Sequence, residues 1–220
     1  FNVSSQMGFN TNATFRNFQL TDGTAKDYLG FGAGVRNLPS SFPAHLGEHS
    51  TDEAAAFTRQ INQRWGINKF TAIPDQKISL TSHRSYDVGG WKIGNITNLN
   101  WSTEFDYSET VNNNYIAYDV KNDVSRPRFE YNDIRYKNTS KLGALFNWSF
   151  QRDGSKYELR NFFSQRGVSA LTQREGMNYY SDKDIRKWES LYTGRTTYSG
   201  QISGVHTLRE NVNKVDWTVG

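Results

Sequence analysis

The sequence contains one stretch with the residue types and spacing of a zinc-dependent hydrolase, HLGEH, from His45 to His49. It matches the H-x-x-E-H pattern, in which two histidines bind the metal beside a catalytic glutamate. That chemistry requires a helix, because only a helix places both histidines on one face. Here Pro43 precedes the stretch, Gly47 interrupts it, and the next helix signal begins at Ser50. A solvated loop is therefore the better interpretation, and we expect neither a metal nor another cofactor.

The amino-acid composition excludes several classes of site and function. The chain has no cysteine, which excludes a thiol nucleophile, a disulfide framework and a cysteine metal site. Serine, histidine and aspartate form no recognisable nucleophile–base series, so we do not expect an enzyme. The 26 basic and 22 acidic residues are interspersed, whereas nucleic-acid binding favours a concentrated basic patch. No apolar stretch approaches the ~20 residues of a membrane helix, a limit that does not apply to a transmembrane β-barrel.

Alternating polarity is the strongest structural signal. In the run from Lys141 to Phe163, apolar residues occupy every second position up to an Asp153-Gly154 turn. Asp-Gly favours a type I′ hairpin. The predicted hairpin pairs Phe150 with Tyr157 and Trp148 with Leu159 on an apolar face, and Gln151 with Lys156, Ser149 with Glu158 and Asn147 with Arg160 on a charged face. Asn161, opposite Phe146, does not fit this pattern.

The same alternation recurs along the chain, which predicts about seven strands. They cover residues 1–20, 77–88, 93–107, 129–152, 156–171 and 188–208, and a last one begins at Lys214. Polar loops at 21–75, 109–128 and 172–187 alternate with tight turns at Gly89-Gly90, at Asp153-Gly154 and near 210–213. In the first loop, Ser50 and Glu53 have capping-box spacing and predict a short helix that ends near Trp65.

Two architectures have one apolar and one polar face: a soluble sandwich, and a membrane barrel that is apolar towards lipid. Soluble strands cluster around ~5–6 residues, and these are far longer. Long and short connections alternate strictly, as in outer-membrane barrels with short periplasmic turns and long extracellular loops. The sequence therefore predicts an all-β fold, an antiparallel transmembrane β-barrel.

The barrel interpretation assigns the aromatic residues to the lipid face. A strand tilted by ~45° climbs about 2.3 Å per residue, so Ile93 to Phe105 rises about 28 Å, close to the ~25 Å apolar band. The predicted lipid-facing and girdle residues are Trp91, Trp101, Phe105, Tyr107, Phe146, Trp148, Phe150 and Tyr157. Among these, Trp91, Phe150 and Tyr157 are expected at the turn side, and Trp101, Phe105 and Tyr107 at the loop side.

Other residues are candidates for contact with a solute or with a plug domain. Charged residues on the predicted inner wall are Arg16, Arg135, Lys137 and Arg160, and the loop candidates are Phe31, Arg36, Tyr179 and Tyr180. The alternative is that the charges only hydrate and pair along the wall, and that the loop residues pack loop against loop.

One stretch resembles a known family. Leu29-Gly30-Phe31, Gly34, Arg36, Leu38-Pro39 and Phe42-Pro43, followed by a helix and Trp65, are similar to the first long loop of TonB-dependent outer-membrane receptors of Bacteroidota-type bacteria. The resemblance implies a 22-stranded barrel filled by an N-terminal plug. Residues 1–220 would then form part of the barrel domain, about seven of its strands, without the plug and the TonB box.

The resemblance also implies a function and a location. Such a receptor lies in the bacterial outer membrane and imports a bulky nutrient, with energy supplied by TonB through the plug. The implied partners are outer-membrane lipid, the rest of the barrel and its plug, TonB, and a surface lipoprotein as a further candidate; nucleic acid is not expected. The alternative function is a barrel without transport, acting as an adhesin, binding protein or assembly partner.

Overall fold

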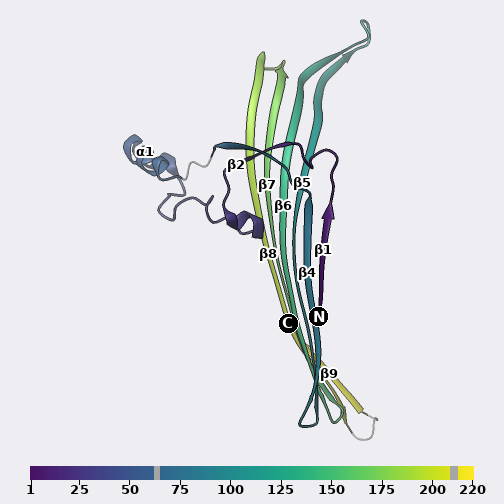
Figure 1. Ribbon diagram of the computed structural model, residues 1–220. Coiled ribbons are helices and arrows are strands. Elements are labelled where there is room, and N and C mark those ends of the chain that lie inside the picture. The colour runs from purple at the N-terminus through teal and green to yellow at the C-terminus, as the bar shows by residue number, and fades with distance from the viewer. Residues whose placement is uncertain (62–64, 209–212) are drawn as a thin grey trace.

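The computed structural model describes residues 1–61, 65–208 and 213–220, and it contains one large antiparallel sheet (Figure 1). The seven strands, in their order across the sheet, are β1 (Asn2–Gly8), β4 (Asp75–Val88), β5 (Trp91–Asp119), β6 (Val124–Arg152), β7 (Ser155–Asn178), β8 (Lys183–Leu208) and β9 (Asn213–Val219). The predicted all-β class and the seven strands are confirmed, although only the five from β4 to β8 are long and β1 and β9 have seven residues each. The sheet is open, because β1 and β9 each pair with one strand only within the described ranges.

Tight turns at one end of the sheet set the register. Gly89 and Gly90 join β4 to β5, and Asp153 and Gly154 join β6 to β7; all four residues have positive φ, as a type I′ turn requires. The Asp153-Gly154 hairpin pairs Phe150 with Tyr157, as predicted. The pairs Trp148–Leu159, Gln151–Lys156 and Ser149–Glu158 are confirmed as well.

The structure also explains Asn161, the residue that did not fit the alternation. Its side-chain amide donates to the Phe146 carbonyl at 3.3 Å, and its backbone N–H donates to the Asn147 side-chain oxygen at 3.0 Å. Tyr198 donates its hydroxyl to the Asn161 side-chain oxygen at 2.9 Å. Asn161 is therefore tolerated on the apolar face because its polar side chain is bonded within the sheet.

Two of the predicted polar loops were wrong. The 109–128 range is strand except for a turn at 120–123, and the 172–187 range is strand except for a turn at 179–182. A run of polar residues can continue as a strand when the side chains of neighbouring strands form favourable pairs across the sheet. Here Arg174 forms a two-pronged ion pair with Asp133, both contacts at 2.7 Å, and Arg186 pairs with Glu175 at 2.7 Å.

The first 75 residues also differ from the prediction. The expected strand over residues 1–20 is broken after Gly8, where the N–H groups of Ala13 and Thr14 bond to the Asn10 carbonyl. A separate strand, β2 (Asn17–Thr21), then pairs with β3 (Ile67–Thr71), which lies inside the predicted 21–75 loop. The rest of that loop holds two 3₁₀ helices, η1 (Ala25–Leu29) and η2 (Leu46–Glu48), and the α-helix α1 (Thr51–Arg59).

The predicted capping box of α1 is confirmed. The Ser50 backbone N–H donates to the Glu53 carboxylate at 3.0 Å, and the Glu53 N–H donates to the Ser50 hydroxyl at 3.4 Å. The Ser50 hydroxyl, which donates to the same carboxylate at 2.8 Å, and the Ser50 N–H lower the pKa of Glu53. The helix ends at Arg59, before Trp65, and the predicted stretch 62–64 lies outside the described residues. No helix among the described residues is long and apolar enough to span a membrane.

Residues 9–61 and 65–72, which we call the cover, form a separate layer that packs against the large sheet through β2 and η1. Phe18 of β2, 1% exposed, meets Phe105 at 5.4 Å and Tyr136 at 5.2 Å between ring centroids. Figure 1 shows β2 and η1 against one side of the sheet, with α1 standing away from it. Burial of a phenylalanine contributes about 1.5–3 kcal/mol, so this aromatic cluster is a main attachment of the cover.

A second attachment depends on two glycines. Gly30, with φ +82, follows η1 and lies against Gly167 of β7. A Cβ on Gly30 would meet the Gly167 nitrogen at 2.9 Å, and one on Gly167 would meet the Gly30 Cα at 2.6 Å. The Gln165 side chain donates to the Gly30 carbonyl beside this contact. The two backbones can approach only because neither residue has a side chain.

We expect Gly167→Ala to detach this part of the cover. Overpacking of this kind costs about 1–3 kcal/mol, which should speed tryptic cleavage after Lys26 at least about fivefold. The matched control is Gly194→Ala, whose new Cβ would meet the Ala33 Cβ at an ordinary 3.5 Å. Equal cleavage rates for the two variants would contradict the role given to the Gly30–Gly167 contact.

Candidate functional site

The register gives the large sheet two chemically different faces. One, the aromatic face, carries Trp91, Phe146, Trp148, Phe150 and Tyr157 and is the face that the cover contacts. The other, the charged face, carries Arg135, Lys137, Lys141, Glu158 and Arg160. Three neighbouring apolar residues, Ile96, Leu145 and Phe162, interrupt the charged face.

On the aromatic face, apolar residues form a band at the turn end of the sheet. In β5 the band runs from Trp91 to Trp101, a length of about 33 Å along the strand at ~3.3 Å per residue. Beyond it the same face carries small polar residues that the cover buries: Thr103, Asn138, Ser140, Gln165 and Ser169. The cover thus ends the exposed part of the band.

Polar side chains within this band are bonded to the sheet itself. Asn95 donates its amide to the Asn147 carbonyl at 3.1 Å and accepts from the Thr97 hydroxyl at 3.1 Å. Asn161 is satisfied in the same way. A buried or lipid-facing amide without such partners would cost several kcal/mol.

The predicted loop-side girdle is not lipid-exposed as expected. Phe105 is 4% exposed beneath Phe18, so its assignment to the lipid face was wrong. Tyr107 packs on Tyr136 at 5.2 Å, and Trp101 donates its indole N–H to the Tyr28 carbonyl at 2.6 Å. All three lie on the predicted face, but the cover, which alternation within the strands cannot reveal, reaches them.

The charged face brings several predicted contact residues together as ion pairs. Lys137 meets Asp106 at 2.7 Å, and Arg160 pairs with Glu158 and donates to Gln201 at 3.3 Å. Arg135 lies on the same face and is exposed. These residues follow the wall of the sheet and do not converge on one point.

Arg36, another predicted contact residue, organises the cover. Its guanidinium donates to both Asp27 carboxylate oxygens, at 3.1 and 2.7 Å, and to the Gly32 carbonyl at 2.8 Å. It also lies 4.4 Å from the centre of the Tyr192 ring on β8. The side chains of Arg36 and Asp27 are mostly buried, so this arginine is committed to internal bonds.

The remaining loop candidates lie in two separate places. Phe31 stacks on Phe163 of the aromatic face, with ring centroids 6.4 Å apart and planes 13° apart. Tyr179 donates to Glu130 at 2.9 Å, and Tyr180 lies in the β7–β8 turn with Arg128 5.4 Å from its ring centre. The structure therefore does not bring all the predicted contact residues into one site.

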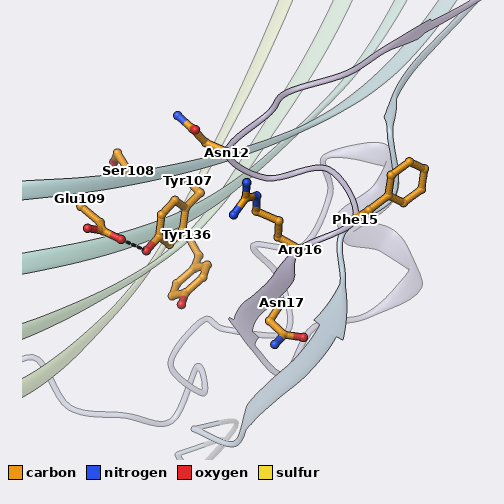
Figure 2. Close-up of a pocket in the computed structure, with 8 residues that line it drawn as sticks. All are labelled: Asn12, Phe15, Arg16, Asn17, Tyr107, Ser108, Glu109 and Tyr136. Carbon is orange, nitrogen blue, oxygen red and sulfur yellow. Dashed lines mark hydrogen bonds between the residues drawn. The ribbon is translucent and has the colours of Figure 1, made fainter.

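Arg16 instead belongs to a groove between the cover and the sheet (Figure 2). The groove has a volume of about 860 Å³ and is lined by Asn12, Phe15, Arg16, Asn17, Tyr107, Ser108, Glu109 and Tyr136. Placing Arg16 on the same wall as Arg135 was wrong, because the chain leaves the sheet after Gly8 and carries Arg16 over the aromatic face.

A strained turn shapes the cover side of this groove. Phe15 has φ +61, a left-handed conformation that costs a bulky residue roughly 1–2 kcal/mol. It is held there because its N–H bonds to the Ala72 carbonyl at 2.9 Å, and the Ala72 N–H bonds to the Arg16 carbonyl at 3.0 Å. The Phe15 ring is nevertheless 68% exposed at the groove.

The sheet side of the groove presents two tyrosines and a carboxylate. The Tyr107 hydroxyl donates to Glu109, which raises the pKa of Tyr107 to about 12 and keeps its proton in place at neutral pH. Gln19 donates to the Tyr136 hydroxyl at 3.4 Å. The sequence analysis did not identify Tyr136, Glu109, Asn12 and Asn17 as residues of this site. Alternation along the two paired strands already places Tyr107 and Tyr136 on the same face of the sheet, which could have indicated Tyr136.

The HLGEH stretch forms the 3₁₀ helix η2, with His45 and His49 at its two ends. The His49 ring lies 3.9 Å from the Glu53 carboxylate and 5.2 Å from the Phe57 ring centre. Across the described residues, no three His, Cys, Asp or Glu side chains come together to hold a metal. Comparisons of the chain with known protein families, curated proteins and solved structures found no match.

Arg36 offers a test of the cover's internal bonding. We expect Arg36→Gln to cost about 1–3 kcal/mol, because Asp27 keeps a mostly buried charge that has lost its partner. Amide hydrogen exchange of residues 25–36 should accelerate accordingly. Arg128→Gln removes an arginine from an exposed tyrosine and should change stability by less than ~0.5 kcal/mol. Similar exchange in both variants would refute the assignment.

Proposed function

We propose that this chain forms a section of the wall of a TonB-dependent outer-membrane receptor that imports a bulky nutrient. The observation that carries the proposal is the aromatic band on one face of long antiparallel strands, with ion pairs on the opposite face. At the ~45° tilt of transmembrane strands this band would be about 23 Å tall. A transmembrane barrel requires this combination, since one face of each strand meets lipid and the other meets a watery lumen.

The exposure of the band favours a membrane over a soluble sandwich. Phe146 is 47% exposed, and Tyr198 and Ile202 on β8 are exposed as well. A sandwich would cover such a face with a second sheet, whereas in the described residues the cover reaches only the upper end of the band, at Trp101 and Phe163. Lipid is the partner that an apolar band of this height fits, and the internally bonded Asn95 and Asn161 suit that setting.

The two edges of the sheet support a larger assembly. β1 and β9 carry backbone groups available for further strands, and exposed edges of this kind are sticky. We infer that neighbouring strands of a wide barrel, of about 22 strands by the family resemblance, continue from both edges. The charged face would then line the lumen and meet the plug domain through which TonB acts.

The loop that carries the family resemblance has a defined role in this proposal. Gly30, Phe31 and Arg36 of that motif make the contacts that bind the cover to β7 and β8. Because short turns of such barrels are periplasmic, the cover lies on the extracellular side. There a surface lipoprotein is a candidate partner.

Two substitutions at one level of the sheet test the membrane assignment. In the full-length protein, we expect Phe146→Arg to destabilise by ~2–4 kcal/mol, because it places a charge towards the middle of the bilayer. Ile96→Arg is the control: Ile96 is similarly exposed, at 52%, but lies on the charged face, so the cost should be small. Refolding in lipid vesicles measures both, and equal costs would refute the assignment.

Transport is tested in cells. We expect deletion of the gene to abolish growth on one class among oligosaccharides, peptides and ferric chelates, each supplied as the limiting nutrient. Loss of TonB should abolish the same growth while leaving the surface level of the protein unchanged. Growth that is indifferent to both deletions, with adhesion to surfaces lost instead, would favour the alternative of an adhesin barrel.

A further inference from the structure

We propose that the groove between the cover and the sheet binds the saccharide part of glycolipids in the outer leaflet. The chemical class of the ligand follows from the groove itself. Its source rests on the proposed function, because only the membrane assignment places glycolipids beside this face.

The lining of the groove combines aromatic rings with planar polar groups. Phe15 and the partly exposed Tyr107 supply the accessible rings, while Tyr136, which is 7% exposed, adds only a small area to the lining. Arg16 donates its Nε–H to the Thr11 carbonyl at 2.9 Å, which orients the guanidinium, and neither Nη group hydrogen-bonds to another of the described residues. A sugar offers both complementary features: C–H groups on its ring faces and neighbouring hydroxyls that a guanidinium, amide or carboxylate can hold in pairs.

Other ligand classes fit less well. A phosphate or another anion would meet one arginine and, across the groove, the carboxylate of Glu109. A wholly apolar ligand would remove Arg16, Glu109, Asn12 and Asn17 from water without replacing their hydrogen bonds. The balanced charge and the volume of about 860 Å³ suit a neutral stretch of several sugar units.

The conformation of Phe15 is independent support. A bulky residue is strained in a left-handed conformation, whereas glycine would adopt the same conformation without strain. The Phe15 side chain contributes little to the stability of the fold, since it is mostly exposed and its aromatic neighbour is Phe9, with ring centroids 6.2 Å apart. Strain of this kind, held in place by the bonds to Ala72, is characteristic of ligand contacts.

The position of the groove indicates the source of the saccharide. Tyr107 lies six residues beyond Trp101 along β5, about 14 Å above the upper end of the apolar band. Both tyrosines lie on the aromatic face, which in the proposed barrel points outwards to the lipid. At that height and on that side, the neighbours of the wall are the sugar chains of outer-leaflet glycolipids.

The test measures binding of the purified full-length protein in detergent to three probes. They are lipopolysaccharide from the source bacterium, the same saccharide after removal of its lipid, and soluble maltoheptaose. We expect binding to the first two, weakened at least about tenfold by Phe15→Gly and by Arg16→Gln. Phe15→Gly should not lower the unfolding temperature, because it relieves backbone strain, so a lost ligand contact is separable from a damaged fold.

Arg128→Gln, the matched arginine beside the exposed Tyr180, should leave binding unchanged. Unchanged binding in the Phe15 and Arg16 variants, binding that requires the lipid part, or a preference for maltoheptaose would each overturn the inference. If the protein passes the Phe146 and Ile96 test but lacks groove-dependent binding, this inference alone fails. If it binds the saccharide but fails that test, the proposed function fails together with the glycolipid source, and the saccharide class of the ligand stands.

Discussion

The antiparallel hydrogen-bond ladder, with its register set by two-residue turns, is the constraint on which the rest of this structure depends. Successive side chains of a strand point to opposite faces, so a slip of one residue would exchange the two faces. The Gly89-Gly90 and Asp153-Gly154 turns prevent such a slip at the end of the sheet where the aromatic residues gather. The aromatic band, the charged wall and the groove all follow from this register.

The cover divides the aromatic face into two regions with different physical roles. Next to the turns, large apolar side chains remain open to their surroundings. Farther along, small residues such as Ser140, Gly167 and Ser169 leave room for the cover, and Phe18 closes over Phe105 and Tyr136. Large side chains at those positions would keep the cover away, so side-chain size along a single face sets where the exposed band ends.

The two faces of the sheet differ in their chemistry. The charged face holds paired cations and anions along the strands, which suits a hydrated passage more than a single binding point. The groove lies on the opposite, aromatic face, beneath the cover, and combines rings with polar groups from distant parts of the chain. In the barrel that we propose, the charged face would serve transport and the aromatic face would contact the surroundings of the wall.

The sequence by itself determined the features that depend on near neighbours: the strand alternation, the Asp153-Gly154 hairpin with its partners, and the capping box at Ser50. Turn chemistry and a two-residue period act over a few residues, so they can be read without the fold. Only the tertiary structure decided that Phe105 is buried, that Arg36 is bonded inside the cover, and that Arg16 joins Tyr136 in a groove. Arg16 and Tyr136 are 120 positions apart, and no local pattern records that the chain leaves the sheet after Gly8 and folds back over it.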